Sequence, residues 1–398
     1  MQIESITIKN YRLFHDARLL DIPRLCVLVG ANGTGKSTLL DVFSFLQDCL
    51  LQNVGKALAR RGGYKEVVSR GFTGHPIEIT LQFRMEITGY ERLVTYVLQI
   101  APDVSGRPVI EREILRYKRG ESGAPFHFLD FKKGEGYAIS NEEDFAKPDQ
   151  ELTRERQKLD APDILAVKGL GQFERFKAAR AFRAMIESWH ISDFHVSEAY
   201  PSQEEGWAEH LSVRGNNLAL VANYLFQHHP ERFGRILSAM RRRIPGLSLV
   251  EPRQTEDGRL VLRFQDGNFQ DPFLTRHVSD GTIKMFAYLL LLYDPKPFPL
   301  LAIEEPENQL YVELLPELAE EFRAYAERGG QVFISTHSPD FLNALTLDEI
   351  YCLKKEQGFT VASKASESEN LRALFAAGDL PGYLWKQGLF AGLNQGIG

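Results

Sequence analysis

The stretch that decides the fold is LCVLVGANGTGKST, at residues 25–38. Its apolar opening, bounded by glycine, predicts a strand buried on both faces, as in a parallel sheet. The part that follows, Gly30–Ser37, fits G-x-x-x-x-G-K-[ST], in which glycines let backbone N–H groups turn inward around phosphate oxygens. In that pattern Lys36 places its charge on the β- and γ-phosphates, and the Ser37 hydroxyl ligates Mg²⁺. The candidate phosphate-binding residues are Asn32, Gly33, Thr34, Gly35, Lys36, Ser37 and Thr38.

A helical pattern follows the glycine-rich loop and supplies the context that the motif requires. Apolar residues recur from Leu39 to Leu51 at spacings of one, three and four, which is typical of an amphipathic helix. A glycine turn without function is the alternative, and it explains neither the strand before the loop nor the helix after it. The sequence therefore predicts a nucleotide site.

A second apolar run ends in two carboxylates. Residues 299–303 read PLLAI and lead directly into Glu304 and Glu305. One carboxylate at the carboxyl edge of a strand can hold the Mg²⁺ hydration shell, and another one residue later can polarise an attacking water. We assign Glu304 to the metal and Glu305 to the role of general base. A solvated acidic turn is the alternative.

Two more segments place polar groups at the ends of predicted elements. Residues 331–335 read as another buried strand, and His337 follows it. A histidine beside a γ-phosphate can hold the nucleophilic water and report hydrolysis to neighbouring loops. Ser279, Asp280 and Gly281 open an apolar helix, and such a terminus can bind an anion. The alternatives are a packed or surface histidine and a simple helix cap.

The composition is that of an ordinary globular chain. Its 398 residues include 47 Lys and Arg against 53 Asp and Glu, a net charge of −6, which argues against non-specific coating of nucleic acid. The three cysteines lie far apart, so we expect neither a disulfide framework nor a zinc site. The longest strongly apolar run, residues 286–293, falls short of the roughly 18 residues that a membrane span needs. We expect a cytoplasmic protein without membrane contact.

Strands and helices alternate at both ends of the chain, with other patterns between them. Residues 76–139 hold β-branched and aromatic runs separated by turns, typical of an antiparallel meander. Residues 141–172 are charged and interrupted by Pro and Gly, and are expected to form a loop or a mobile insertion. We predict an α/β fold with a parallel sheet, an antiparallel β subdomain and an inserted helical lobe. The expected domains are 1–140, 141–245 and 246–398.

The motifs together resemble those of the ABC-type ATPases in the branch of the SMC, RecF and OLD proteins, especially the small bacterial predicted ATPases of AAA_21 type. The order is the same: phosphate loop, long insertion, a Ser279–Thr282 signature in place of Leu-Ser-Gly-Gly, acidic strand end and switch histidine. Residues 6–14, ITIKNYRLF, also look like the strand that opens proteins of that branch. The resemblance covers residues 1–50 and 275–355.

The resemblance implies a P-loop ATPase that binds ATP with Mg²⁺ and hydrolyses it, with the phosphate loop, the acidic strand end and His337 in the roles given above. It also implies a head-to-head homodimer, in which the signature of one head caps the nucleotide of the other. The chain departs from the family at Glu304, where most members have Asp, and at Tyr311-Val312, where they have His-Pro. The Q-loop glutamine has no clear counterpart.

The process that the ATPase drives stays open. OLD relatives carry a C-terminal TOPRIM nuclease, but no D-x-D occurs in this chain, so we expect no nuclease. A compact ATPase of this type suggests the regulatory or sensor subunit of a bacterial anti-phage defence system, working with a separately encoded effector. The alternatives are a RecF-like, DNA-binding ATPase of DNA repair and a non-hydrolysing scaffold.

Two further segments have open interpretations. Arg241-Arg242-Arg243 could contact nucleic acid, or could form a solvated helix end whose positive charges are favoured by the helix dipole. The tail at residues 378–385 places aromatic side chains among turn residues, and it is expected to dock on its own domain or on a partner.

Overall fold

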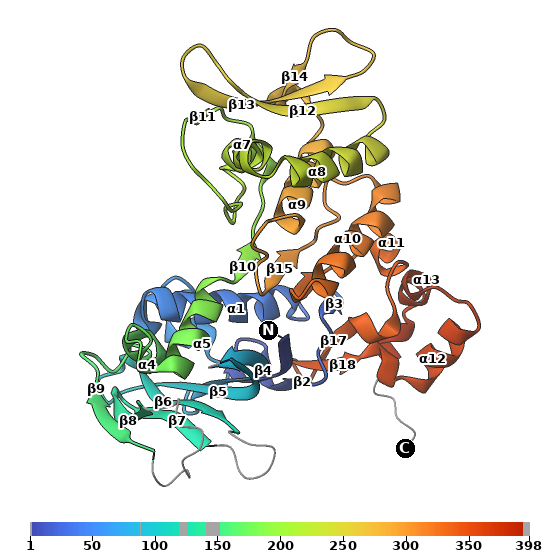
Figure 1. Cartoon of the computed structure of the whole chain (residues 1–398). Helices are drawn as coiled ribbons and strands as arrows, with labels where there is room; N and C mark the ends of the chain where they lie inside the picture. The colour runs from blue at the N-terminus through green and yellow to red at the C-terminus, as the bar shows by residue number, and fades with distance from the viewer. Residues whose placement is uncertain (1, 88, 119–125, 141–151, 393–398) are drawn as a thin grey trace.

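The computed structural model describes residues 2–87, 89–118, 126–140 and 152–392. These residues form three sheets, here called A, B and C, and the helices that cover them (Figure 1). Sheet A is antiparallel and contains the meander predicted over residues 76–139. Its strands, in spatial order, are β2 (Phe14–Leu19), β1 (Gln2–Tyr11), β4 (Ile77–Ile87), β5 (Tyr90–Pro102), β6 (Pro108–Tyr117), β7 (Phe126–Lys132), β8 (Glu135–Ile139) and β9 (Arg154–Lys158).

Sheet B is parallel except at one edge, where β18 runs antiparallel to β17. The expectation of an α/β fold with a parallel sheet is therefore confirmed. Because parallel strands end at the same edge, sheet B brings together loops that are far apart in the sequence. Its strands, in spatial order, are β10 (His190–Ser192), β15 (Leu301–Glu304), β16 (Val332–Ser335), β3 (Leu25–Val29), β17 (Ile350–Glu356) and β18 (Phe359–Lys364).

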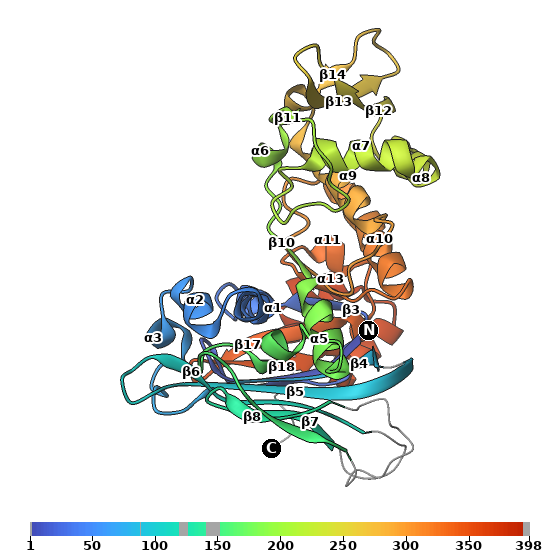
Figure 2. The same ribbon diagram turned by 60° about the vertical axis from the view of Figure 1, so that its left-hand side comes forward.

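Sheet C is a small antiparallel sheet at the far end of the molecule from sheet A (Figures 1 and 2). In both views α9 and α10 lie between sheet B and the lobe that α7, α8 and sheet C form. The strands of sheet C are β11 (Gln203–Glu204), β13 (Arg259–Asp266), β12 (Leu247–Gln254) and β14 (Phe273–Leu274).

Helices join the strands and cover the sheets. Among the described residues, no helix has both the length and the apolar character that crossing a bilayer requires. The α-helices are α1 (Lys36–Leu51), α2 (Val54–Ala59), α3 (Tyr64–Val67), α4 (Ala166–Leu170), α5 (Lys177–Glu187), α6 (Val196–Ala199), α7 (Leu218–His228), α8 (Pro230–Arg243), α9 (Asp280–Leu292), α10 (Leu315–Glu327), α11 (Pro339–Leu342), α12 (Glu369–Ala376) and α13 (Pro381–Lys386).

The central position of β3 explains why its sequence is apolar throughout. Cys26 and Leu28 belong to the hydrophobic core shared with sheet A and α1. Val27 and Val29 belong to a second core on the opposite face, shared with α9 and α10. A strand covered on both faces needs an apolar residue at each position. The buried strand predicted before the phosphate loop is thus confirmed.

The helix after the phosphate loop is fixed to sheet A by one carboxylate. Asp41 of α1 accepts hydrogen bonds from the Tyr11 hydroxyl at 2.7 Å and from Arg61 Nε at 2.8 Å. Asp41 Oδ2, which accepts the Tyr11 hydroxyl, also pairs with Arg12 Nη1 at 3.1 Å. These bonds join β1, the turn after β1 and the end of α2 to the helix whose N-terminus faces the candidate site.

Part of the loop expected at residues 141–172 is regular structure. Residues 141–151 lie outside the described part, but β9 and α4 occupy much of the remainder. A buried carboxylate on β6 holds α4 in place: Glu113 accepts the backbone N–H groups of Ala166 and Val167 at the N-terminus of that helix. Burial raises the pKa of Glu113 to about 7.

The segment 141–245 contributes to both hydrophobic cores. Phe182 of α5 packs against Phe83 and Tyr96 of sheet A, with ring centroids 5.3 and 4.4 Å apart. Helices α7 and α8 instead belong to the second core. The segment 141–245 is therefore shared between the two cores, and the division into three domains stays a proposal.

Candidate nucleotide site

The phosphate loop, Gly30–Ser37, joins β3 to α1 at the carboxyl edge of sheet B. Its glycines meet specific geometric needs: Gly35, the N-cap of α1, has a φ of 102°. A Cβ at Gly30 would lie only 2.4 Å from the backbone oxygen of Leu353 and 2.5 Å from Thr34 Oγ1. Larger residues would therefore push the loop away from sheet B. The loop is tightly wound and leads its backbone into the N-terminus of a long helix, an arrangement that favours anions.

Lys36 lies across this loop. Its side chain is buried, and its ammonium donates to the backbone oxygens of Gly30 at 2.8 Å and Ala31 at 3.2 Å. Burial lowers the pKa of Lys36, and the charges of Glu305, Glu304 and Glu307 oppose this shift. The lysine therefore lies in the field of the acidic strand end, as a residue that binds phosphates beside a metal site would.

The parallel register brings the acidic strand end level with the phosphate loop. Glu304 of β15 pairs with Ser335 of β16, and Ser335 pairs with Leu28 of β3. Both the Glu304 carboxylate and the Ser37 residue are exposed at this edge. Two exposed oxygen ligands match the preference of Mg²⁺, which keeps several waters and is usually bound through one or two carboxylates plus phosphates. The residues present therefore fit ATP and Mg²⁺.

Glu305 and His337 lie next to each other. The His337 Nε2 atom lies 3.4 Å from Glu305 Oε1, and the Asn308 side chain donates to Glu305 Oε2 at 2.8 Å. Glu305 has a φ of +42°, and its N–H donates to the Ser335 oxygen at 2.9 Å. A non-glycine residue with positive φ is uncommon, and the surrounding bonds hold it there. The carboxylate and the imidazole can thus share a proton or a water.

Glu307 has a role that was not assigned from the sequence. Its Oε1 accepts hydrogen bonds from Thr336 Oγ1 at 2.6 Å, from the His337 N–H at 2.8 Å and from the Ser338 N–H at 3.2 Å. It therefore fixes the backbone of the loop that carries His337. The sequence shows that Glu307 follows Glu305 by two residues. It does not show that the side chain of Glu307 contacts the loop after β16.

The predicted signature opens α9. Ser279 is the N-cap, accepting the Thr282 N–H at 3.3 Å, and its Oγ lies 2.8 Å from Thr282 Oγ1. Asp280 is bonded through its carboxylate to the Tyr200 hydroxyl and to Gln309 Nε2, the latter at 3.2 Å. In the single chain, Ser279 therefore acts as the N-cap of α9, which is the alternative given above. Anion binding by the same terminus stays a proposal.

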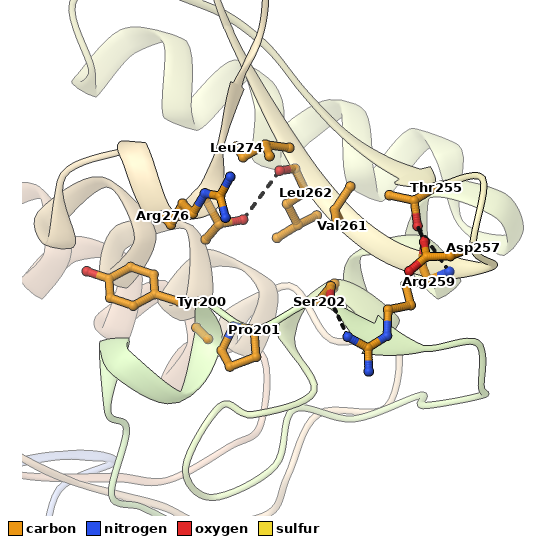
Figure 3. A pocket seen from close by; sticks show the side chains of 13 residues that line it. Tyr200, Pro201, Ser202, Thr255, Asp257, Arg259, Val261, Leu262, Leu274 and Arg276 are labelled. Atoms are coloured by element: carbon orange, nitrogen blue, oxygen red, sulfur yellow. Dashed lines mark hydrogen bonds between the residues drawn. The ribbon is translucent and has the colours of Figure 1, made fainter.

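The pocket beside this terminus is distinct from the phosphate loop. It has a volume of about 440 Å³ and is lined by Tyr200, Arg259 and Arg276 among others (Figure 3). No residue of Gly30–Ser37 lines it. It lies between sheet C and the loop after α6, and Tyr200, one of its lining residues, donates its hydroxyl to Asp280.

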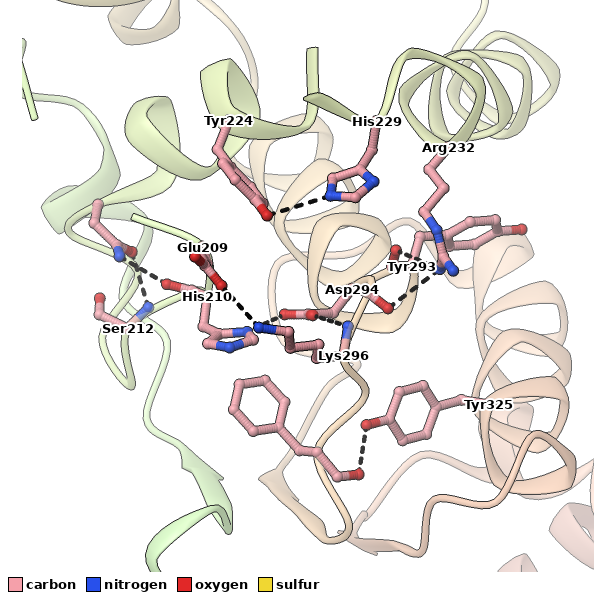
Figure 4. A network of polar contacts seen from close by, with 12 residues as sticks. Glu209, His210, Ser212, Tyr224, His229, Arg232, Tyr293, Asp294, Lys296 and Tyr325 are labelled. Carbon is pink, nitrogen blue, oxygen red and sulfur yellow. Dashed lines mark hydrogen bonds and ion pairs between the residues drawn. The ribbon is translucent and has the colours of Figure 1, made fainter. Parts of the chain in front are cut away.

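The far end of α9 is held by Arg232 and by a polar network. Arg232 of α8 donates to the carbonyl oxygens of Tyr293 and Asp294 at 3.5 and 3.3 Å (Figure 4). The Asp294 carboxylate pairs with His210 Nδ1 at 2.7 Å. Cationic groups at a helix C-terminus satisfy its free carbonyls and oppose its dipole. The helix is therefore anchored to the lobe at this end.

Another strand, β10, ends at the same edge of sheet B, and it was not identified from the sequence. Strand β10 lies beside β15, with Ser192 level with Ile303. The next residue, Asp193, is therefore level with Glu304 at the carboxyl edge. The strand is only three residues long, so its apolar signal was too weak to place it in the sheet.

The two segments with open interpretations have clear positions. Arg243 is buried and pairs with Glu317 and Glu321, both at 2.8 Å, and Arg241 donates to the Ser248 oxygen. These two arginines therefore hold α8 to its neighbours. The tail docks on its own domain: Leu384 of α13 is buried in the second core, confirming that interpretation.

Comparisons with known proteins agree with this geometry. A sequence model of the AAA_21 family, described as "AAA domain, putative AbiEii toxin, Type IV TA system", matches residues 25–343. Among curated proteins, none matches the chain.

Solved structures of SMC heads share the fold. One, an SmcHead bound to the C-winged helix domain of ScpA, is 14% identical with a TM-score of 0.53, over 92% of this chain and 99% of that chain. Another, an Smc head domain from Pyrococcus furiosus with an extended coiled coil, bound to the C-terminal domain of ScpA, is 12% identical with a TM-score of 0.52, over 95% of this chain and 100% of that chain.

Proposed function

Because the chain belongs to the AAA_21 family and has the fold of an ABC-type ATPase head of the SMC and RecF branch, we propose that it binds ATP with Mg²⁺ and hydrolyses it. One observation carries this proposal. Lys36, Glu304 and the Glu305–His337 pair come from separate segments of the chain and meet at one edge of sheet B.

Each of these groups has a role in phosphoryl transfer to water. Lys36 neutralises the β- and γ-phosphates, and the backbone N–H groups of residues 32–38 surround them. Ser37 and Glu304 hold Mg²⁺, which neutralises charge that develops on the phosphate oxygens. Glu305 accepts the proton of the attacking water, and His337 orients that water and senses the γ-phosphate. Glu307 positions His337 by holding its backbone.

The active form is a head-to-head dimer with ATP in the interface. The N-terminus of α9 carries the positive end of a helix dipole and has no phosphate of its own to meet. A second head, inverted by a two-fold axis, places its phosphate loop opposite Ser279, Asp280 and Gly281. ATP then contributes to the attraction between the two copies.

In the cell, the ATPase regulates a separate effector, as in an anti-phage defence system. The proposal draws on the family description, which names a putative AbiEii toxin of a type IV TA system and so links related chains to toxin-type modules. The effector is a protein encoded apart from this chain, and the ATP-bound dimer is the form that controls it.

The experiment that tests this proposal is sedimentation velocity with and without ATP. The Glu305→Gln variant should bind ATP without hydrolysing it, and should shift from monomer to dimer when ATP and Mg²⁺ are added. Ser279→Arg, which puts bulk and charge into the helix terminus, should bind ATP as a monomer and lose turnover. An ATP-bound Glu305→Gln protein that stays monomeric at micromolar concentration would contradict the dimer.

A second measurement separates the cellular roles. Turnover is followed with duplex DNA ends and, separately, with the purified product of the adjacent gene. Stimulation by the adjacent gene product alone supports the regulatory role. Stimulation by DNA ends alone would favour the DNA-repair alternative and refute the effector.

A further inference from the structure

Lys284 is a charged side chain in the most apolar helix of the site. It lies on α9, where the residues from Thr282 to Leu292 are all buried, and only 5% of its own surface is exposed. Burial lowers the pKa of Lys284 to about 8, against the opposing charges of Glu307 and Glu305. A buried ammonium is costly unless it is well bonded, so its partner identifies what it stabilises.

That partner is the loop that follows the acidic strand end. Lys284 Nζ donates to the backbone oxygen of Asn308 at 2.7 Å. The Asn308 side chain in turn donates to Glu305 Oε2 at 2.8 Å, and the Asn308 N–H donates to the Glu305 oxygen at 3.1 Å. The ammonium on α9 is therefore separated from the carboxylate of Glu305 by a single residue.

Two other contacts join the same helix terminus to the same loop. Gln309 Nε2 donates to Asp280 Oδ2 at 3.2 Å. The backbone at Gly281 comes so close to this loop that a Cβ there would lie 2.7 Å from the Gln309 oxygen. Together with the Lys284 bond, these contacts make the first turns of α9 and residues 305–310 a single packed unit.

We propose that Lys284 is a positioning residue that transmits the state of the α9 N-terminus to Glu305 through Asn308. This inference rests on the proposed function, because it requires the nucleotide of a second copy to contact the α9 terminus. When that contact forms, α9 and the loop at 305–310 move together, and Glu305 reaches the geometry needed to take a proton. Hydrolysis at one site then depends on the nucleotide held by the other copy.

The coupling predicts a particular pattern of kinetic changes. Lys284→Met keeps an unbranched apolar stem in the helix and removes the N–H donors. ATP affinity, and ATP-driven dimerisation of the Lys284→Met/Glu305→Gln double variant, should match those of the parent proteins. The turnover number should fall about tenfold to a hundredfold, as expected when a reacting group loses its alignment. The Hill coefficient for ATP should fall towards one.

A matched control and a second variant keep the test decisive. Lys296→Met makes the same substitution at an exposed lysine on the loop after α9, and should behave as the unmodified protein. Asn308→Ala removes the amide that holds Glu305 but keeps the backbone oxygen that Lys284 uses. It should lower turnover like Lys284→Met, and it replaces that variant if Lys284→Met does not fold. The two changes combined should lower turnover no further than either alone, since they break one path.

Two results would overturn the inference, and they differ from a failure of the proposed function. Folded Lys284→Met with unchanged turnover and cooperativity would make Lys284 purely structural. A combined variant whose losses add would place Lys284 and Asn308 on separate paths. Absence of ATP binding and turnover in the unmodified protein would instead refute the proposed function, and the coupling with it.

Discussion

Stability should fall on acidification because of His190, on β10. The ring of His190 is 3% exposed, its Nε2 has no hydrogen-bond partner within the described ranges, and it packs on Phe298 with centroids 4.7 Å apart. Burial, followed by the charge of His210, lowers the pKa of His190 to about 4. Since β10 pairs with β15, His190 lies on an edge strand of sheet B.

The sign and size of the effect follow from proton binding. At pH values between the folded pKa of His190 and its unfolded pKa of about 6.5, the unfolded chain binds a proton at this residue and the folded chain does not. The free energy of unfolding therefore falls as the pH falls. At pH 5 the loss from His190 amounts to about 2 kcal/mol relative to pH 7.5. It approaches a limit below pH 4, where both states are protonated.

The assay is urea denaturation at pH 7.5 and at pH 5 for the unmodified protein and for His190→Phe. The variant keeps an aromatic ring against Phe298 and should lose about 2 kcal/mol less on acidification. Phe298→Leu is the control: it weakens the same packing without removing the titrating group, so it should lower stability at both pH values. Equal acid losses in His190→Phe and the unmodified protein would refute the reasoning.

Three glycine substitutions give further predictions. Gly30→Ala puts a Cβ 2.4 Å from a β17 backbone oxygen. Calorimetry should therefore show lost ATP binding, and the free energy of unfolding should fall by about 1–3 kcal/mol. Normal ATP affinity would contradict this. Gly281→Ala, 2.7 Å from the Gln309 oxygen, should lower turnover at least about tenfold in steady-state assays while ATP still binds; full turnover would mean the loop can shift freely. Gly382→Ala, 1.9 Å from the Pro339 oxygen, should release α13 from α11 and speed cleavage of the tail in limited proteolysis; an unchanged cleavage rate would show that the tail docks elsewhere.

The parts of the site that were predicted from the sequence are those that a local pattern determines. The strand, glycine loop and helix at residues 25–51 are consecutive, so apolar spacing and glycine positions suffice to identify them. The acidic strand end and the strand before His337 were identified in the same way. We expected these strands to be neighbours because alternating strands and helices predict a parallel sheet, and because of the family resemblance.

The parts that were missed depend on pairing between distant segments. Strand β10 has three residues, and it joins sheet B only because it pairs with β15, more than a hundred residues later in the chain. The Glu113 carboxylate on β6 orders α4 from a distant strand. Glu307 looked like one more acid in a polar turn, yet three donors around His337 converge on one of its oxygens. No spacing in the sequence reports such contacts.

The measurement that tests the central claim most directly is Mg²⁺-dependent phosphate release from ATP by the Glu305→Gln variant, with its ATP binding measured in parallel. The account predicts that the unmodified protein turns over ATP and that Glu305→Gln keeps its ATP affinity while turnover falls about a hundredfold or more, as expected for loss of a general base. Lys36→Ala should lose turnover because it removes the ammonium that neutralises the β- and γ-phosphates. Turnover by Glu305→Gln at the rate of the unmodified protein would contradict the account.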